Sequence, residues 1–265
     1  MMREILSDLV AEQQHLDQFL QSLRDRQWAT DTPAAGWTIQ DTVSHLAYVE
    51  RFAAEVLADG QARIDTEGVS DVDNWTEVGV KEGRGRRHQE IIEWWRFGRA
   101  DVVDALSRMQ SNDRVPWLFG TMSARSFASI RLMETWAHGL DVKEAILGRN
   151  TPLEKRPEEL DEEEEWVDPI ADTPRLRHIA SLGQRSLPFS FAEAGEEFPE
   201  SGIRIEVMGP LYAAWRFGPE DTDNVIKGLA GDWCRVIVQR QKPEDTGLVA
   251  IGEFAAKALE IARVY

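Results

Sequence analysis

Residues 131–141 read RLMETWAHGLD and lie at the centre of the segment that decides the fold. Apolar residues recur through this stretch and its flanks at the spacing of a buried helix, which predicts a helix over about residues 122–147, ending before Gly148. Glu134 and His138 are four positions apart, so their side chains project from one face, one turn apart. At this spacing two side chains can share a metal ion, although such pairs also form ordinary surface hydrogen bonds.

A third metal ligand has to come from another helix, and His45 is the candidate. Residues 38–41, TIQD, match the capping signature that starts a helix, which should continue to about Leu57. His45 lies about two turns into this helix among apolar residues, close to its inward face. A core histidine satisfied by protein groups is the alternative interpretation. One carboxylate and two imidazoles would suit zinc or nickel and leave coordination positions open for water or substrate.

Four helical patterns precede residue 150. They cover about residues 2–28, 38–57, 86–110 and 122–147, and each carries an apolar stripe at helical spacing. Residues 60–84 are polar and contain several Gly and Asp, which predicts a long connection. Four long helices with such connections predict an all-α four-helix bundle.

The rest of the chain has a different pattern. We predict a bundle over residues 1–150, an acidic linker bounded by prolines over 151–175, and a small α+β domain over 176–265. Short apolar or alternating runs predict strands in this last part, separated by helical patterns. The expected strands are 187–191, 203–208, 212–217, 225–226 and 248–251, and the expected helices are 230–238 and 253–264.

Composition excludes several classes of function. The formal net charge of -17 disfavours binding to nucleic acid, because phosphate backbones would be repelled. No apolar run approaches the roughly 20 residues of a membrane-spanning helix, and the first residues are charged and amphipathic, unlike a signal peptide. Cys234 is the single cysteine, which excludes an internal disulfide and a cysteine-based zinc cluster. We expect a cytoplasmic protein without membrane or nucleic-acid partners, either monomer or homodimer.

Two segments together resemble a known family. Residues 32–46, TPAAGWTIQDTVSHL, and residues 134–141, ETWAHGLD, are similar to the two signatures of the mycothiol-dependent maleylpyruvate isomerase family. The N-terminal domain of that family is a DinB-like metal-binding four-helix bundle, and the resemblance covers residues 1–148. It implies that His45, Glu134 and His138 bind a divalent metal, with zinc expected first and nickel second.

The C-terminal part resembles, more loosely, the sterol-carrier-like domain that follows the bundle in this family. Residues 225–233, VIKGLAGDW, are similar to its step from strand into helix. In the family an arginine near the end of that helix assists catalysis, and Arg240 is the matching residue, although Gln239 stands where a glycine is frequent. Holding a substrate carboxylate would suit the guanidinium group. The alternative is a solvated cation at a helix end.

The resemblance implies a metal-dependent enzyme that uses a low-molecular-weight thiol, mycothiol or a similar compound, on a small electrophilic substrate. In the isomerase the thiolate adds to a cis double bond, rotation follows, and elimination gives the trans product; an S-transferase would instead keep the thiol on the product. One alternative is a non-catalytic DinB-like metal-binding protein with a stress or regulatory role. Another is a lipid-type carrier built on the C-terminal domain. Trp37 and Trp136 are expected to flank the metal site, and Cys234 to be a core residue.

Overall fold

The computed structural model describes residues 2–69, 71–118, 120–148 and 170–264. The chain divides into two compact units, Met1–Ala171 and Asp172–Tyr265. Most of the acidic linker expected at residues 151–175 lies outside the described residues, so its boundaries stay a prediction. Among the described residues, every helix is too short or too polar to cross a membrane.

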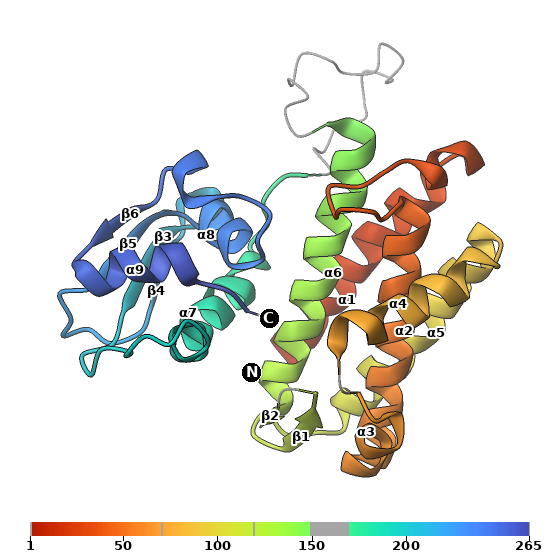
Figure 1. Cartoon of the computed structure of the whole chain (residues 1–265), viewed down its shortest axis with the longest axis horizontal. Helices are drawn as coiled ribbons and strands as arrows, with labels where there is room; N and C mark the ends of the chain where they lie inside the picture. The colour runs from red at the N-terminus through yellow and green to blue at the C-terminus, as the bar shows by residue number, and fades with distance from the viewer. Residues whose placement is uncertain (1, 70, 119, 149–169, 265) are drawn as a thin grey trace. The chain divides into compact units, whose positions relative to one another are not determined.

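Four long helices form the frame of the first unit. They are α1 (Met2–Ser22), α2 (Ile39–Asp59), α5 (His88–Ser107) and α6 (Ala124–Leu147). Helix α1 packs against α5 and α6, and α2 packs against the same two helices, which makes a four-helix bundle (Figure 1). Their inward faces carry the apolar stripes seen in the sequence, including fully buried Leu9, Phe52, Trp95 and Phe127.

The long connection expected at residues 60–84 is wrong, because most of this segment is helical. It forms α3 (Gln61–Glu67) and α4 (Val72–Arg84), and Asp71 caps α4 by accepting a hydrogen bond from the backbone N–H of Asn74. Of the glycines in this segment, Gly60 and Gly68 flank α3 with positive φ, whereas Gly79 and Gly83 are packing positions within α4.

Two glycines of α4 let this helix approach α2 closely. A Cβ at Gly79 would lie 2.3 Å from Cβ of Tyr48, and one at Gly83 would lie 2.2 Å from Cβ of Ser44. Because both side chains belong to α2, only residues without a Cβ fit at these two positions of α4. Helix α4 is therefore a fifth packing element beside the bundle.

A two-stranded antiparallel hairpin connects α5 to α6. Its strands are β1 (Arg114–Trp117) and β2 (Gly120–Ser123), and Pro116 lies in β1 opposite Thr121. Trp117 packs its ring against Phe52 and Phe127, which anchors the hairpin to the bundle core.

The second unit is a four-stranded mixed sheet with three helices. Its strands lie in the order β4-β3-β5-β6; β3 and β5 are parallel, and the other pairs are antiparallel. Its elements are α7 (Leu176–Glu193), β3 (Arg204–Met208), β4 (Ala214–Phe217), β5 (Val225–Leu229), α8 (Ala230–Ile237), β6 (Val249–Ile251) and α9 (Glu253–Ile261). A four-helix bundle followed by a small α+β part confirms the predicted fold class.

The strand expected at residues 187–191 is wrong, because this run belongs to α7. Leu187 and Phe191 are fully buried and four positions apart, so they share the inward face of a helix. Gly183, one turn earlier, allows Ile237 of α8 to approach; a Cβ at Gly183 would lie 2.3 Å from its Cδ1. Packing against α8 therefore decides a segment whose short apolar run fits either structure.

Candidate metal centre

The start of α2 fixes His45 in place. Thr38 Oγ1 accepts a hydrogen bond from the backbone N–H of Asp41, and Asp41 Oδ2 accepts one from the backbone N–H of Thr38. This is the predicted capping box. Asp41 also accepts a bond of 2.8 Å from Nε of Arg84, which ties α2 to α4. Burial raises the pKa of Asp41, but the bonds from Arg84 and Thr38 outweigh it and hold that pKa below its ordinary value.

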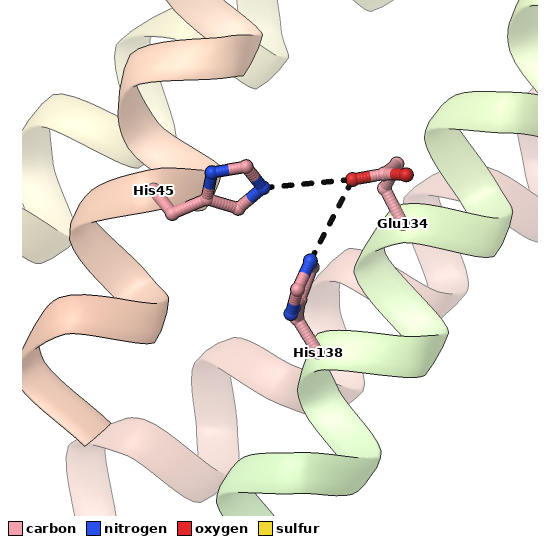
Figure 2. A group of neighbouring side chains, drawn as sticks. All are labelled: His45, Glu134 and His138. Carbon is pink, nitrogen blue, oxygen red and sulfur yellow. Dashed lines mark ion pairs between the residues drawn. The ribbon is translucent and has the colours of Figure 1, made fainter. Parts of the chain in front are cut away.

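Glu134 and His138 lie one turn apart on α6, on the face directed at α2. Helix α6 is capped by Ser123, whose hydroxyl accepts a hydrogen bond from the backbone N–H of Ser126. Figure 2 shows the three side chains pointing toward one another, with His45 approaching from α2. All three are shielded from solvent, with side-chain exposures of 7% for His45, 16% for Glu134 and 13% for His138.

The donor atoms converge without completing hydrogen bonds. Oε2 of Glu134 lies 3.7 Å from Nε2 of His45 and 3.7 Å from Nε2 of His138. One donor atom from each of the three residues lies within 4.8 Å of the other two. Ligand atoms that share a zinc ion at about 2.1 Å lie roughly 3.4 Å apart. The carboxylate oxygen is therefore close to that spacing from both imidazoles.

The chemistry of this donor set fits a divalent metal ion. Two imidazoles and one carboxylate are ligands that zinc and nickel accept, and three protein ligands leave a position open. Nδ1 of His138 lies 3.3 Å from Oδ2 of Asp141 without completing a hydrogen bond among the described residues. A carboxylate beside this nitrogen is the usual orienting partner of a metal-bound histidine. Among the described residues, Nδ1 of His45 has no hydrogen-bond partner.

Electrostatics keep the ligands in the forms that a metal needs. Burial by itself raises the pKa of Glu134, but His45, Arg131 and His138 together lower it to about 2. Burial lowers the pKa of His45, and Glu134 acts in the opposite direction without cancelling this effect. Near neutral pH the site therefore presents an ionised carboxylate and a neutral His45 imidazole.

Trp37 forms one wall of the cluster. Its ring lies 5.0 Å from the ring of His45 and 6.1 Å from that of His138, centroid to centroid. Its indole Nε1 donates a hydrogen bond of 3.0 Å to Oε1 of Glu77 on α4. Trp136, also expected near the site, is buried on α6. Trp37 is thus the aromatic side chain in ring contact with both ligand imidazoles.

A second charged pair lies between the same two helices and was missed by the sequence analysis. Glu50 on α2 is fully buried, and Arg131 on α6 is 2% exposed. Nη1 of Arg131 lies 3.9 Å from Oε1 of Glu50. The sequence holds one usable signal, since Arg131 precedes Glu134 by three positions and shares its helix face.

Arg240 belongs to the second unit, so its predicted role toward the metal site stays a prediction. Its backbone N–H donates to the carbonyl of Arg235, and its Nη1 donates 2.8 Å to the carbonyl of Val238. Gln239 adopts a left-handed backbone with φ of 58°, a conformation that glycine takes without strain. The buried Cys234 thiol donates to the carbonyl of Leu176, as expected of a core residue.

The fold and the cluster define a helical-bundle protein with a candidate metal site of two histidines and one glutamate. Residues 9–143 match the family model of the mycothiol maleylpyruvate isomerase N-terminal domain, and the chain belongs to that family. Among curated proteins it is 32% identical to the uncharacterized proteins Rv0036c and MT0041 of two Mycobacterium tuberculosis strains, covering 98% of this chain and 94% of theirs.

Solved structures agree on the fold. The crystal structures of the mycothiol-dependent maleylpyruvate isomerase and of a mutant of that enzyme match with a TM-score of 0.55. Each covers 94% of this chain and 92% of its own, at 15% sequence identity. At this identity the likeness shows the fold, both of the bundle and of the second unit, but not the reaction.

Proposed function

We propose that this chain is a metal-dependent enzyme that uses a low-molecular-weight thiol of the mycothiol type on a small electrophilic substrate. The observation that carries the proposal is the buried convergence of His45, Glu134 and His138 in a member of this family. Zinc is the expected metal and nickel the second candidate, given the nitrogen and oxygen donors.

A bound zinc ion would lower the pKa of a coordinated thiol, so that a thiolate is present near neutral pH. His45 and His138 would contribute neutral nitrogen donors and Glu134 the one negative charge. The side chain of Trp37 would close one side of this position against water. Together these residues would hold the reacting sulfur in a partly desolvated site.

The thiol has to come from outside the chain. Cys234 is the single cysteine, it is buried, and burial raises its pKa well above the ordinary value. A buried thiol that stays protonated is a poor nucleophile. A thiol-dependent reaction therefore needs an external thiol as cosubstrate. We also propose a cytoplasmic monomer or homodimer, without nucleic acid or membrane as partner.

Two reactions fit this chemistry, cis–trans isomerisation and transfer of the thiol to an electrophile. Both begin with attack of a thiolate on an electron-poor carbon, and they differ in whether the sulfur is later eliminated. We propose that Arg240 binds a substrate carboxylate, a task that suits its planar guanidinium group.

The test is consumption of maleylpyruvate and of a panel of small electrophiles by zinc-loaded protein, with and without mycothiol. We expect turnover that requires both the metal and the thiol. Metal-free protein and the His138→Ala variant are the negative controls. Bound metal without turnover across the panel would instead favour a non-catalytic metal-binding protein, and failure to bind either zinc or nickel would overturn the proposal altogether.

A further inference from the structure

Glu50 and Arg131 form a charged pair in the interior of the bundle, on the same two helices that carry the candidate ligands. Glu50 follows His45 on α2, and Arg131 precedes Glu134 by one turn on α6. The two side chains are 0% and 3% exposed, and the shortest contact between them is 3.9 Å. A buried pair at this distance is not a strong stabilising contact, because desolvation of both charges opposes it.

The pair is also incompletely hydrogen-bonded. Among the described residues, neither carboxylate oxygen of Glu50 has a hydrogen-bond partner, and neither does Nε of Arg131. The guanidinium group lies over the rings of Trp117 and Phe127, at 5.1 Å and 5.8 Å. An apolar pair of similar volume would serve packing at least as well. The charges therefore call for a reason other than stability.

Arg131 lies in the field of two carboxylates. Its positive charge lowers the pKa of Glu134 and also opposes the effect of burial on Glu50. The other cation that acts on Glu50 is Arg99 of α5, but that guanidinium is held by Asp17 and by the backbone carbonyl of Gln13. Arg131 is thus the cation left for Glu50, and Glu134 is the competing anion.

The position of Glu50 is enforced by close packing. A Cβ at Gly98 of α5 would lie 3.1 Å from Cβ of Glu50 and 2.8 Å from the backbone nitrogen of Arg51. Helix α5 therefore packs tightly against the backbone of this turn of α2, which fixes where the Glu50 side chain begins.

We propose that Glu50 is a positioning residue of the metal centre: it engages Arg131 and so leaves the Glu134 carboxylate available to the metal ion. A guanidinium group and a divalent cation compete for the same carboxylate oxygens. Without Glu50, the unopposed Arg131 pairs with Glu134 and must be displaced before a metal can bind. This inference rests on the metal-binding part of the proposed function and not on turnover.

The experiment measures zinc affinity by competition with a chromophoric chelator for wild type, Glu50→Gln, Arg131→Met and the double variant. It is run at about pH 8, where a carboxyl group with a pKa of about 7 is ionised. We expect Glu50→Gln to weaken zinc binding about 10-fold or more, the range seen for outer-shell partners. The double variant should return to within about threefold of wild type, because the competing cation is gone.

Two controls separate this role from a structural one. Glu67→Gln removes a carboxylate that accepts hydrogen bonds from Tyr48 and Trp75, so it should lower the melting temperature and leave zinc affinity unchanged. If Glu50→Gln does not fold, Glu50→Asp, which retracts the charge by one methylene, should show a smaller loss that Arg131→Met again reverses.

The outcomes are distinct. Wild-type affinity in Glu50→Gln, or a double variant as weak as Glu50→Gln, would overturn the role of Glu50. Wild-type protein that binds neither zinc nor nickel would instead overturn the proposed function. Cobalt substitution gives an independent reading, since the absorption bands of bound Co²⁺ should change in Glu50→Gln and recover in the double variant.

Discussion

The indole nitrogen of Trp37 donates a 3.0 Å hydrogen bond to Oε1 of Glu77, and this bond anchors the wall of the candidate metal site to α4. The ring of Trp37 lies beside the imidazoles of His45 and His138. Helix α4 thus supports the site without contributing a candidate ligand.

Trp37 should report metal binding by fluorescence. Bound Co²⁺ or Cu²⁺ quenches the fluorescence of an indole that lies within a few ångströms of the metal ligands. Addition of either metal should therefore lower the tryptophan fluorescence of the wild-type protein. In Trp37→Phe we expect most of this metal-dependent change to disappear while zinc still binds. Trp28→Phe is the matched control, because Trp28 stacks on His88 instead of on the ligand rings. Equal quenching in wild type and Trp37→Phe would contradict the geometry.

Removal of one imidazole should abolish metal retention. His138→Ala deletes one of the three converging donors, and two ligands bind zinc far more weakly than three. We expect about one zinc per chain in wild type and nearly none in the variant, measured by plasma emission after dialysis. His88→Ala serves as the control, because His88 pairs with Asp25 outside the cluster. Unchanged stoichiometry in His138→Ala would exclude this residue as a ligand.

The sequence allowed prediction of the four long helices of the bundle and of the two ligand candidates that share a face of α6, but not of α3, α4 or α7. Glu134 and His138 share a face by spacing alone, and the capping box at Thr38 and Asp41 placed His45 in its helix. The third donor, however, depends on how α2 packs against α6. Periodicity gives the inward face of each helix but not which inward faces meet. The family resemblance was therefore needed to assign His45, Glu134 and His138 to one site.

The errors have local physical causes. Gly79 and Gly83 look like breakers in a single sequence, yet they are the points where α4 touches α2. The run around Pro188 has the composition of a strand, yet packing against α8 makes it helical. Glu50 and Arg131 were missed because charged residues are expected at the surface, and only tertiary packing buries them.

Burial of Glu50 should make the stability of metal-free protein depend on pH. Burial raises the pKa of Glu50 from 4.5 to about 7, with Arg131 opposing this. Between these values the folded state binds more protons than the unfolded state, so the free energy of unfolding falls as the pH rises, and levels off above about 7.

Glu50→Gln removes this proton and should flatten that part of the profile. Urea unfolding from about pH 5 to pH 8 should show the wild type losing about 1–3 kcal/mol relative to the variant as the pH rises. Glu67→Gln is the control. Burial raises the pKa of Glu67, but hydrogen bonds from Tyr48, Arg63 and Trp75 outweigh it and lower this pKa below 4.5. The contribution of Glu67 to the free energy of unfolding therefore changes with pH only in the acid range, below that of Glu50. A constant difference between wild type and Glu50→Gln would contradict the expectation.

The role of Arg240 can be tested apart from metal binding by measuring both zinc content and turnover in the same variant. If it binds a substrate carboxylate, Arg240→Ala should retain zinc and lose at least about 10-fold in kcat/KM, the cost of one charged hydrogen bond. Arg216→Ala removes an exposed cation of the same unit and should leave both zinc content and turnover unchanged. Full activity in Arg240→Ala would discard the proposed role, and loss of zinc would point to a structural one.

The contact between α4 and α2 at Gly83 should be intolerant of even one methyl group. A Cβ at Gly83 would lie 1.8 Å from Oγ and 2.2 Å from Cβ of Ser44. The hydroxyl can rotate but Cβ cannot, so α4 has to move away from α2. Gly83→Ala should therefore lower the free energy of unfolding by about 1–3 kcal/mol in urea titrations, the usual cost of overpacking. Zinc affinity should also fall, because Ser44 precedes a candidate ligand.

Gly85 is the matched control two residues later. Its φ of -87° suits alanine, and a Cβ there would meet nothing within 4 Å, so Gly85→Ala should change stability by no more than about 0.5 kcal/mol. The contact can also be relieved from the other helix: Ser44→Gly in the Gly83→Ala background removes both clashing atoms. That double variant should regain zinc affinity despite the roughly 1 kcal/mol that glycine costs within a helix. If it stays as weak as Gly83→Ala, close approach of the two helices does not govern the site.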